Sequence, residues 1–245
     1  MKALYSHGDS VVWGAELENK QTERYSHHLA NHFGWVDCNN ASAGVSNDYI
    51  YRQTLRDVAH WLEHKIVWSE ETDWIEADEL IVVIGWTSPT RFEWWTGKEY
   101  QQERLWVGYD KWGENDKDRT TEDQFVLNQT EDIPSYIRTY NHIISLASFL
   151  DKNNISYYFF NTFYDYKKQY EPTNLIDRYG KPNFQLGLSA LWKQLPDEFT
   201  FGNMYDYIQF MGEGFLPRNH PTKEAHKEWS NFLIKELMDY EKTID

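Results

Sequence analysis

The chain has a single cysteine, Cys38, among its 245 residues, which excludes an internal disulfide framework. It also lacks positive charge: 24 Lys and Arg stand against 39 Asp and Glu, for a formal net charge of −15. Nucleic-acid affinity depends on neutralising phosphates, so we expect neither nucleic acid nor an anionic membrane as a partner. No apolar run could span a bilayer, and the first residues show no signal-peptide pattern. We therefore expect cytoplasmic synthesis, which is also compatible with later incorporation into a phage particle.

Aromatic residues, by contrast, are abundant, at 17% of the chain with 12 Trp and 17 Tyr. So many large rings require a sizeable core, and those left over suit a ligand or partner surface. A length of 245 residues fits one large α/β domain better than two small ones. We expect residues 1–245 to form a single domain.

Short apolar runs alternate with amphipathic segments, which predicts strands and helices in turn. The clearest strand is the continuous β-branched run at 80–84, which suits a strand buried on both faces. The other strands are predicted at 2–6, 35–38 and 155–161, and the helices at 22–33, 46–65, 134–153, 184–194, 203–211 and 222–240. Strands separated by helices predict a parallel sheet with helices on both faces, the three-layer α/β/α class.

The alternation breaks between about Trp94 and Pro134, where the chain is charged, aromatic and poorly periodic. A connection of this length inside a compact domain is usually a lid, an interface arm or a loop. We predict an insertion at about 94–134 and regard it as a candidate contact for a second copy of the chain or an assembly partner.

Gly8-Asp9-Ser10 follows directly after the first predicted strand. In open α/β sheets, ligands bind at the carboxyl ends of the strands, which is where Ser10 is expected. At the other end of the chain, His220-Pro221 precedes the last predicted helix. If the fold joins them, Ser10 and His220 are the nucleophile and the base of an acyl transfer. The alternative is that both segments are only structural. Gly8-Asp9-Ser10 would then form a tight βα turn, and His220 would be a turn residue.

These segments, taken in order, resemble the SGNH (GDSL-type) hydrolases, a family of esterases and lipases with a flavodoxin-like fold. The four sequence blocks of that family correspond to 8–10, 44, 85–87 and 217–220 of this chain. The order and spacing of the blocks make the resemblance specific, although each block alone is weak. It implies a flavodoxin-like domain with a mostly parallel five-stranded sheet.

The resemblance also implies roles for individual residues. Ser10 would be the nucleophile and His220 the base. The oxyanion hole would use the backbone N–H groups of Ser10 and Gly44, with a side-chain donor at Thr87. Neither a cofactor nor a metal is implied.

Thr87 departs from the family pattern, because the family has an asparagine in the oxyanion hole at this place. A threonine hydroxyl can donate a hydrogen bond but is shorter than an asparagine amide, and losing such a donor costs roughly a hundred- to a thousandfold in rate. Either Thr87 substitutes for the amide, or Ser88 or Arg91 reaches in instead. Arg91 could also bind a substrate carboxylate or only pair with one of the many surface acids.

Pro217 is the second departure, because the family has an aspartate there that orients the histidine. The carbonyl of Pro217 could accept a hydrogen bond from Nδ1 of His220 and select its tautomer, but it carries no charge to support an imidazolium. Asp206 and Glu213 are the other candidates for that role. The sequence therefore predicts a Ser–His dyad or a degenerate triad.

Three more residues are expected to support the site. Asp9 can cap the helix that follows the tripeptide, Asn40 can steady the second-block loop through side-chain hydrogen bonds, and Gly44 can form a tight turn. None of these roles conflicts with the catalytic interpretation.

The segment 60–64 matches the inverted zinc-protease motif His-x-x-Glu-His. Its spacing places His60 and His64 on one helical face, as zinc ligands require. The same helix presents apolar residues to the core, so the two histidines are most simply polar residues at its flank. His28 and His32 repeat the spacing and are interpreted in the same way, and we predict no metal site.

The leading functional hypothesis is a serine esterase that hydrolyses a small acyl ester, with an O-acetyl group on a carbohydrate as the favoured substrate. The carbohydrate preference rests on family precedent and on the aromatic residues Trp86, Trp94 and Trp95 near the third block. Lysophospholipase and thioesterase specificities stay open.

The alternative is a weak or inactive module with this fold, used for binding or assembly, for example in a phage particle. The two altered positions and the long insertion favour it. Retention of Ser10, Gly44 and His220 together favours the enzyme, because a pure scaffold needs none of them.

Overall fold

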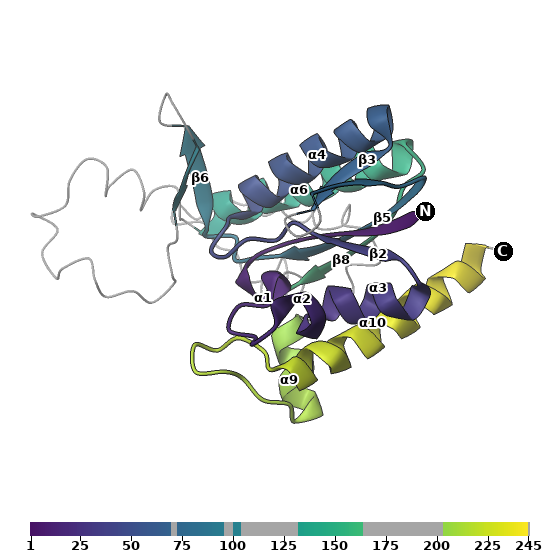
Figure 1. The fold of residues 1–245 in the computed structure, drawn as a ribbon. Coiled ribbons are helices and arrows are strands. Elements are labelled where there is room, and N and C mark those ends of the chain that lie inside the picture. The colour runs from purple at the N-terminus through teal and green to yellow at the C-terminus, as the bar shows by residue number, and fades with distance from the viewer. Residues whose placement is uncertain (70–72, 96–99, 104–131, 164–202, 245) are drawn as a thin grey trace, which may run out of the picture.

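The computed structural model describes residues 1–69, 73–95, 100–103, 132–163 and 203–244. A four-stranded sheet lies at the centre of this part of the chain (Figure 1). Its strands, in spatial order, are β2 (Val36–Asn39), β1 (Lys2–His7), β5 (Glu79–Trp86) and β8 (Ser156–Asn161). Every neighbouring pair is parallel, with Ala3 opposite both Val36 and Leu80. The mostly parallel sheet is thus confirmed, and it contains the four strands predicted by residue range. The described residues hold no fifth strand of this sheet.

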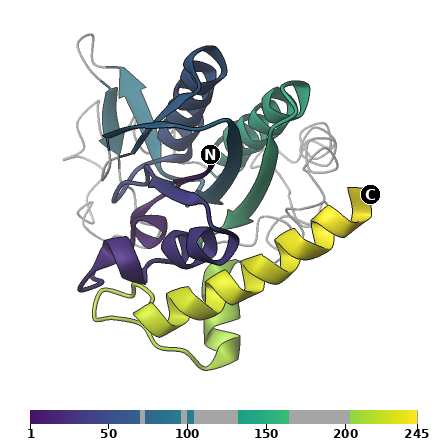
Figure 2. The ribbon, with the colours of Figure 1, turned by 45° about the vertical axis from the view of Figure 1, so that its right-hand side comes forward.

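Helices cover both faces of the sheet (Figures 1 and 2). One face packs against α4 (Asn47–His64) and α6 (Asp132–Lys152). The other packs against α3 (Tyr25–Phe33), α9 (Met204–Met211) and α10 (Lys223–Ile244). The three-layer α/β/α class follows from this arrangement.

The apolar run in β5 divides its side chains between two cores. Val82 and Ile84 join the cluster under α4 and α6, whereas Ile81 and Val83 join the cluster under α3 and α10. All four side chains are almost completely buried. A strand with a core on each face needs apolar residues at every position, which explains the unbroken run.

The predicted helix at 22–33 is in fact two helices, α2 (Lys20–Glu23) and α3. They are separated at Arg24, which has an extended backbone. The guanidinium of Arg24 is fully buried and its Nη2 lies 2.9 Å from Oδ2 of Asp37 on β2. The break places this cation against the sheet. The break depends on a tertiary contact, so the helical periodicity of the sequence could not predict it.

Two short hairpins were not predicted. One pairs β3 (Ile66–Ser69) with β4 (Asp73–Glu76), and the other pairs β6 (Phe92–Trp95) with β7 (Tyr100–Glu103). The second hairpin lies partly in the expected insertion at about 94–134, most of which lies outside the described residues, as does the predicted helix at 184–194. No helix in the described ranges is long and apolar enough to cross a membrane.

The turn after β1 depends on close packing around Val12 of the short helix α1 (Ser10–Trp13). A Cβ on Gly8 would lie 2.3 Å from Cγ2 of Val12 and 2.8 Å from the carbonyl oxygen of Gly85. A Cβ on Gly85 would lie 2.5 Å from the same Val12 methyl group. Both glycines are therefore required by space, and together they let α1 approach the ends of β1 and β5.

We predict that Gly8→Ala lowers the free energy of unfolding by about 1–3 kcal/mol, because the methyl group overlaps backbone and side-chain atoms that cannot move apart cheaply. Urea denaturation measures the change. Gly214→Ala is the matched control, since its added Cβ would meet Thr222 only at an ordinary 3.4 Å. Equal effects of the two substitutions would contradict the packing argument.

Candidate active site

Ser10 lies at the carboxyl edge of the sheet, where β1 ends at His7. Asp9 is the N-cap of α1, and its Oδ1 accepts a hydrogen bond from the N–H of Val11 at 3.0 Å. Ser10 is thus the first residue of the helix and is only half-buried. Its hydroxyl is held at a fixed place and is reachable from solvent.

A tight turn at the other end of the chain presents His220. The N–H of Leu216 donates to the carbonyl of His220 at 2.7 Å, and Phe215 and Pro221 form an antiparallel bridge. Nε2 of His220 lies 3.0 Å from Oγ of Ser10. The fold therefore brings together two side chains that are 210 positions apart in the sequence.

Glu16 lies on the opposite side of the imidazole. Its Oε2 is 2.7 Å from Nδ1 of His220 and also accepts a hydrogen bond from the N–H of Arg218 at 3.2 Å. The backbone of Glu16 has φ 67°, a left-handed conformation that is uncommon outside glycine. Residues held in such a conformation are concentrated at functional sites, because the surrounding contacts must compensate its cost.

Glu16 was not among the carboxylates considered from the sequence, and the prediction for Pro217 is corrected here. The Nδ1 of His220 faces the Glu16 carboxylate rather than the carbonyl of Pro217, and neither Asp206 nor Glu213 makes a hydrogen bond to His220. The acid lies six residues after the serine rather than near the histidine in the sequence. The only local hint is an acid two residues after the helix stop at Gly14, which is too common a pattern to identify a site.

The charge of Glu16 fixes the tautomer of His220. The hydrogen bond from the imidazole, above all, holds the pKa of Glu16 below its usual value, against a smaller opposing effect of desolvation. An ionised carboxylate only accepts hydrogen bonds, so Nδ1 carries the proton and Nε2 is the acceptor for the Ser10 hydroxyl. This arrangement of hydroxyl, imidazole and carboxylate has the geometry of a Ser–His–acid triad.

Thr87 does not supply the oxyanion donor that was expected of it. Its hydroxyl donates to Oδ2 of Asp9 at 2.5 Å and accepts from Nη1 of Arg91 at 2.8 Å. A hydroxyl has one hydrogen, and that of Thr87 is used on Asp9. The prediction for Thr87 is therefore wrong in its side-chain role.

Arg91 pairs with an acid, as one of its two interpretations held, but that acid is the buried Asp9 rather than a surface residue. Its Nη1 lies 3.2 Å from Oδ2 of Asp9, which also faces the hydroxyl of Thr162 at 3.4 Å. The Asp9 side chain is fully buried and that of Arg91 is 8% exposed. The Arg91 cation thus neutralises the Asp9 carboxylate, and the Thr87 hydroxyl donates to it, whereas the Thr162 hydroxyl lies closer to the carbonyl of Trp86, at 3.0 Å.

The loop that holds Gly44 lies beside the turn that holds Ser10, because the N–H of Ser42 donates to the carbonyl of Gly8 at 3.1 Å. Gly44 has φ 74°, the left-handed turn expected of it. The amide of Asn40 donates to the carbonyl of Trp68 at 2.7 Å, so it fixes the loop to β3. This is the structural role predicted for Asn40.

Two sequence-based suggestions find no support at their residues. Trp86 is fully buried in the core, so it cannot stack on a sugar, and the side chains of Trp94 and Trp95 lie outside the described set.

The zinc-like motif at 60–64 is the second of these suggestions. Nδ1 of His60 faces the carbonyl of Ile66 at 3.2 Å. Within the described residues, no three His, Cys, Asp or Glu side chains are grouped as metal ligands would be.

Arg91→Met should lower the free energy of unfolding by about 3–5 kcal/mol, because it leaves the Asp9 carboxylate buried without a cation. Lys2→Met is the control: Lys2 and Glu79 are 3.7 Å apart and partly to largely exposed, so the loss there should stay below about 1 kcal/mol. Denaturation midpoints and slopes in urea measure both. A similar small loss for the two variants would show that the Asp9–Arg91 pair is not structurally important.

Solved structures of similar fold include a G-D-S-L family protein from Desulfitobacterium hafniense DCB-2, with 13% identity and a TM-score of 0.43 over 96% of this chain and 98% of that one. The psychrotrophic esterase EstA from Pseudoalteromonas sp. has 13% identity and a TM-score of 0.45 over 98% and 97% of the two chains. The acetyl xylan esterase AlAXEase has 11% identity and a TM-score of 0.46 over 96% of this chain and 99% of that one. An activity does not transfer at such values, so function must be argued from the site itself.

No curated protein matches the chain. A family model described as a family of unknown function (DUF6071) matches residues 14–243, a segment that holds Glu16 and His220 and begins four residues after Ser10. The chain belongs to this family.

Proposed function

We propose that the protein is a serine ester hydrolase in which Ser10 is the nucleophile, His220 the general base and Glu16 the acid that orients the histidine. One observation carries the proposal: the His220 imidazole lies between the Ser10 hydroxyl at 3.0 Å and the Glu16 carboxylate at 2.7 Å. Both distances allow proton transfer or a strong hydrogen bond without rearrangement.

In the first half of the reaction, Oγ of Ser10 attacks the carbonyl carbon of the ester while Nε2 of His220 takes the hydroxyl proton. The imidazolium that results carries a positive charge, which the Glu16 carboxylate at Nδ1 stabilises. The tetrahedral intermediate then expels the alkoxide, which receives the proton from Nε2. An acyl-serine and a free alcohol are the products of this half.

In the second half, water attacks the acyl-serine and His220 again serves as the base. The new tetrahedral intermediate releases Ser10, whose oxygen regains the proton from Nε2, and the carboxylic acid leaves. The site returns to its starting protonation state. No group outside the three side chains and water is needed for proton transfer.

The oxyanion of both intermediates would be held by backbone N–H groups of Ser10 and Gly44. No described residue accepts a hydrogen bond from the Ser10 N–H, which lies in the unpaired first turn of α1. The loop of Gly44 adjoins the same turn through the Ser42–Gly8 hydrogen bond. Since Thr87 has no proton to spare, two donors rather than three are expected.

The substrate class proposed is a small acyl ester, and its narrower form is an O-acetyl group on a carbohydrate. The resemblance of the four sequence blocks to the SGNH hydrolases supports the ester. The partial exposure of Ser10 supports a substrate that approaches from open solvent. Lysophospholipids and thioesters are the competing substrates for the same triad.

A weak or inactive binding module is the second candidate function. One observation favours it, namely the use of the Thr87 hydroxyl on Asp9, which removes the third oxyanion donor. Loss of a donor of this kind costs roughly a hundred- to a thousandfold in rate.

We predict that the protein hydrolyses p-nitrophenyl acetate and reacts with a fluorophosphonate probe, and that Ser10→Ala abolishes both. Glu16→Gln should lower kcat by about a hundred- to ten-thousandfold, because a neutral amide no longer supports the imidazolium or enforces the tautomer. Absorbance at the nitrophenolate band and mass spectrometry of the labelled serine give the two readouts.

Glu18→Gln is the matched control, because Glu18 is an exposed acid on the same loop. Glu213→Gln tests one of the two acids that the sequence offered for orienting His220. Both variants should keep the wild-type kcat. Signals from the wild type no higher than those from Ser10→Ala would refute the enzyme, whereas a loss of activity in Glu213→Gln but not in Glu16→Gln would refute the triad.

A further inference from the structure

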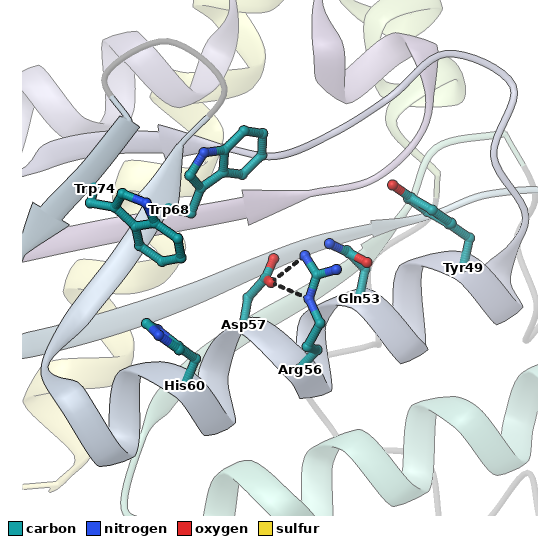
Figure 3. Close-up of a pocket in the computed structure, with 7 residues that line it drawn as sticks. All are labelled: Tyr49, Gln53, Arg56, Asp57, His60, Trp68 and Trp74. Carbon is teal, nitrogen blue, oxygen red and sulfur yellow. Dashed lines mark hydrogen bonds and ion pairs between the residues drawn. The ribbon is translucent and has the colours of Figure 1, made fainter.

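A cavity of about 480 Å³ lies between α4 and the β3–β4 hairpin (Figure 3). Its volume is in the range of small-molecule binding sites. The lining side chains come from four turns of one helix face and from two opposed positions on the hairpin. None of them belongs to the triad.

Aromatic side chains form the walls of this cavity. Trp68 and Trp74 are direct cross-strand partners in the hairpin, so both indoles lie on the same face of it. Trp74 is 60% exposed, and the ring of His60 lies 4.9 Å from it. Tyr49 closes the other end of the cavity, near the start of α4 (Figure 3). Flat apolar rings at both ends suit a ligand that has its own flat, weakly polar faces.

Gln53 supplies a polar group between these walls. Its side chain lines the cavity between Arg56 and Tyr49, as Figure 3 shows, although the residue is only 8% exposed. The Gln53 amide is not among the described buried groups that are cut off from solvent without a partner. It can therefore offer two donors and one acceptor to a molecule in the cavity.

The charges in the cavity cancel. Nε and Nη2 of Arg56 lie 3.0 and 2.9 Å from Oδ1 of Asp57, while Oδ2 of Asp57 accepts from the hydroxyl of Tyr5 at 2.9 Å. An anionic ligand would be repelled by a chain whose net charge is −15. A cationic ligand would compete with Arg56 for the carboxylate of Asp57. A neutral ligand meets neither obstacle.

We propose that this cavity binds a neutral carbohydrate. The apolar faces of pyranose rings would stack on Trp68 and Trp74, and their hydroxyl groups would pair with Gln53 and the Arg56–Asp57 pair. The site is independent of the triad, so it does not depend on the proposed esterase activity.

Isothermal titration of the full chain with cellotetraose, xylotetraose and mannotetraose tests the proposal. We expect saturable binding of at least one of them, weakened about tenfold or more by Trp74→Ala through the lost ring contact. Gln53→Leu should also weaken binding, because it removes the hydrogen-bonding amide while keeping the volume. Thermal unfolding of each variant shows that the fold is retained.

Phe210→Ala is the matched control, since Phe210 is 86% exposed and lies on α9, far from the cavity in the sequence. It should leave affinity unchanged, and so should Ser10→Ala, which separates this site from the triad. Absence of saturable binding up to the solubility limit of all three sugars would overturn the proposal. Binding that survives both Trp74→Ala and Gln53→Leu would do so as well.

Discussion

The parallel pairing of β1 with both β2 and β5 is the constraint on which the site depends. Because β1 is an inner strand, the residues after His7 must emerge between two neighbouring strand ends. Gly8 and Gly85 then allow the turn to fold closely over Val12. The position of the Ser10 hydroxyl is therefore set by the sheet geometry together with the close turn that Gly8 and the Asp9 cap allow.

The electrostatics of the site are arranged in two layers. Beneath the turn, the charge of Asp9 is neutralised by Arg91, and the Thr87 hydroxyl donates a hydrogen bond to it, so Asp9 has a structural role. Above it, Glu16 is partly exposed and directed at the imidazole. Asp9 and Glu16 thus have different roles, although they are only seven positions apart in the sequence.

The sequence predicted the layers of the fold well, because its apolar runs are long and their period is clear. The run at 80–84 identifies the central strand, and Ser46 and Gly34 mark a helix start and a helix stop. It could not reveal the break at Arg24 or the β3–β4 hairpin, which depend on contacts with residues distant in the sequence. At the site, Ser10 and His220 were anticipated from order along the chain, whereas Glu16 was missed because nothing local distinguishes it. Thr87 was misassigned because the use of its single proton is decided by Asp9, 78 positions away.

The location of Glu16 has a consequence for the integrity of the site. Ser10 and Glu16 lie in one short stretch of the chain, and only the imidazole comes from the C-terminal turn, whose Arg218 N–H also donates to Glu16. A displacement of that turn as a whole would carry the imidazole away from Ser10 and Glu16 together, because both contacts belong to the same ring.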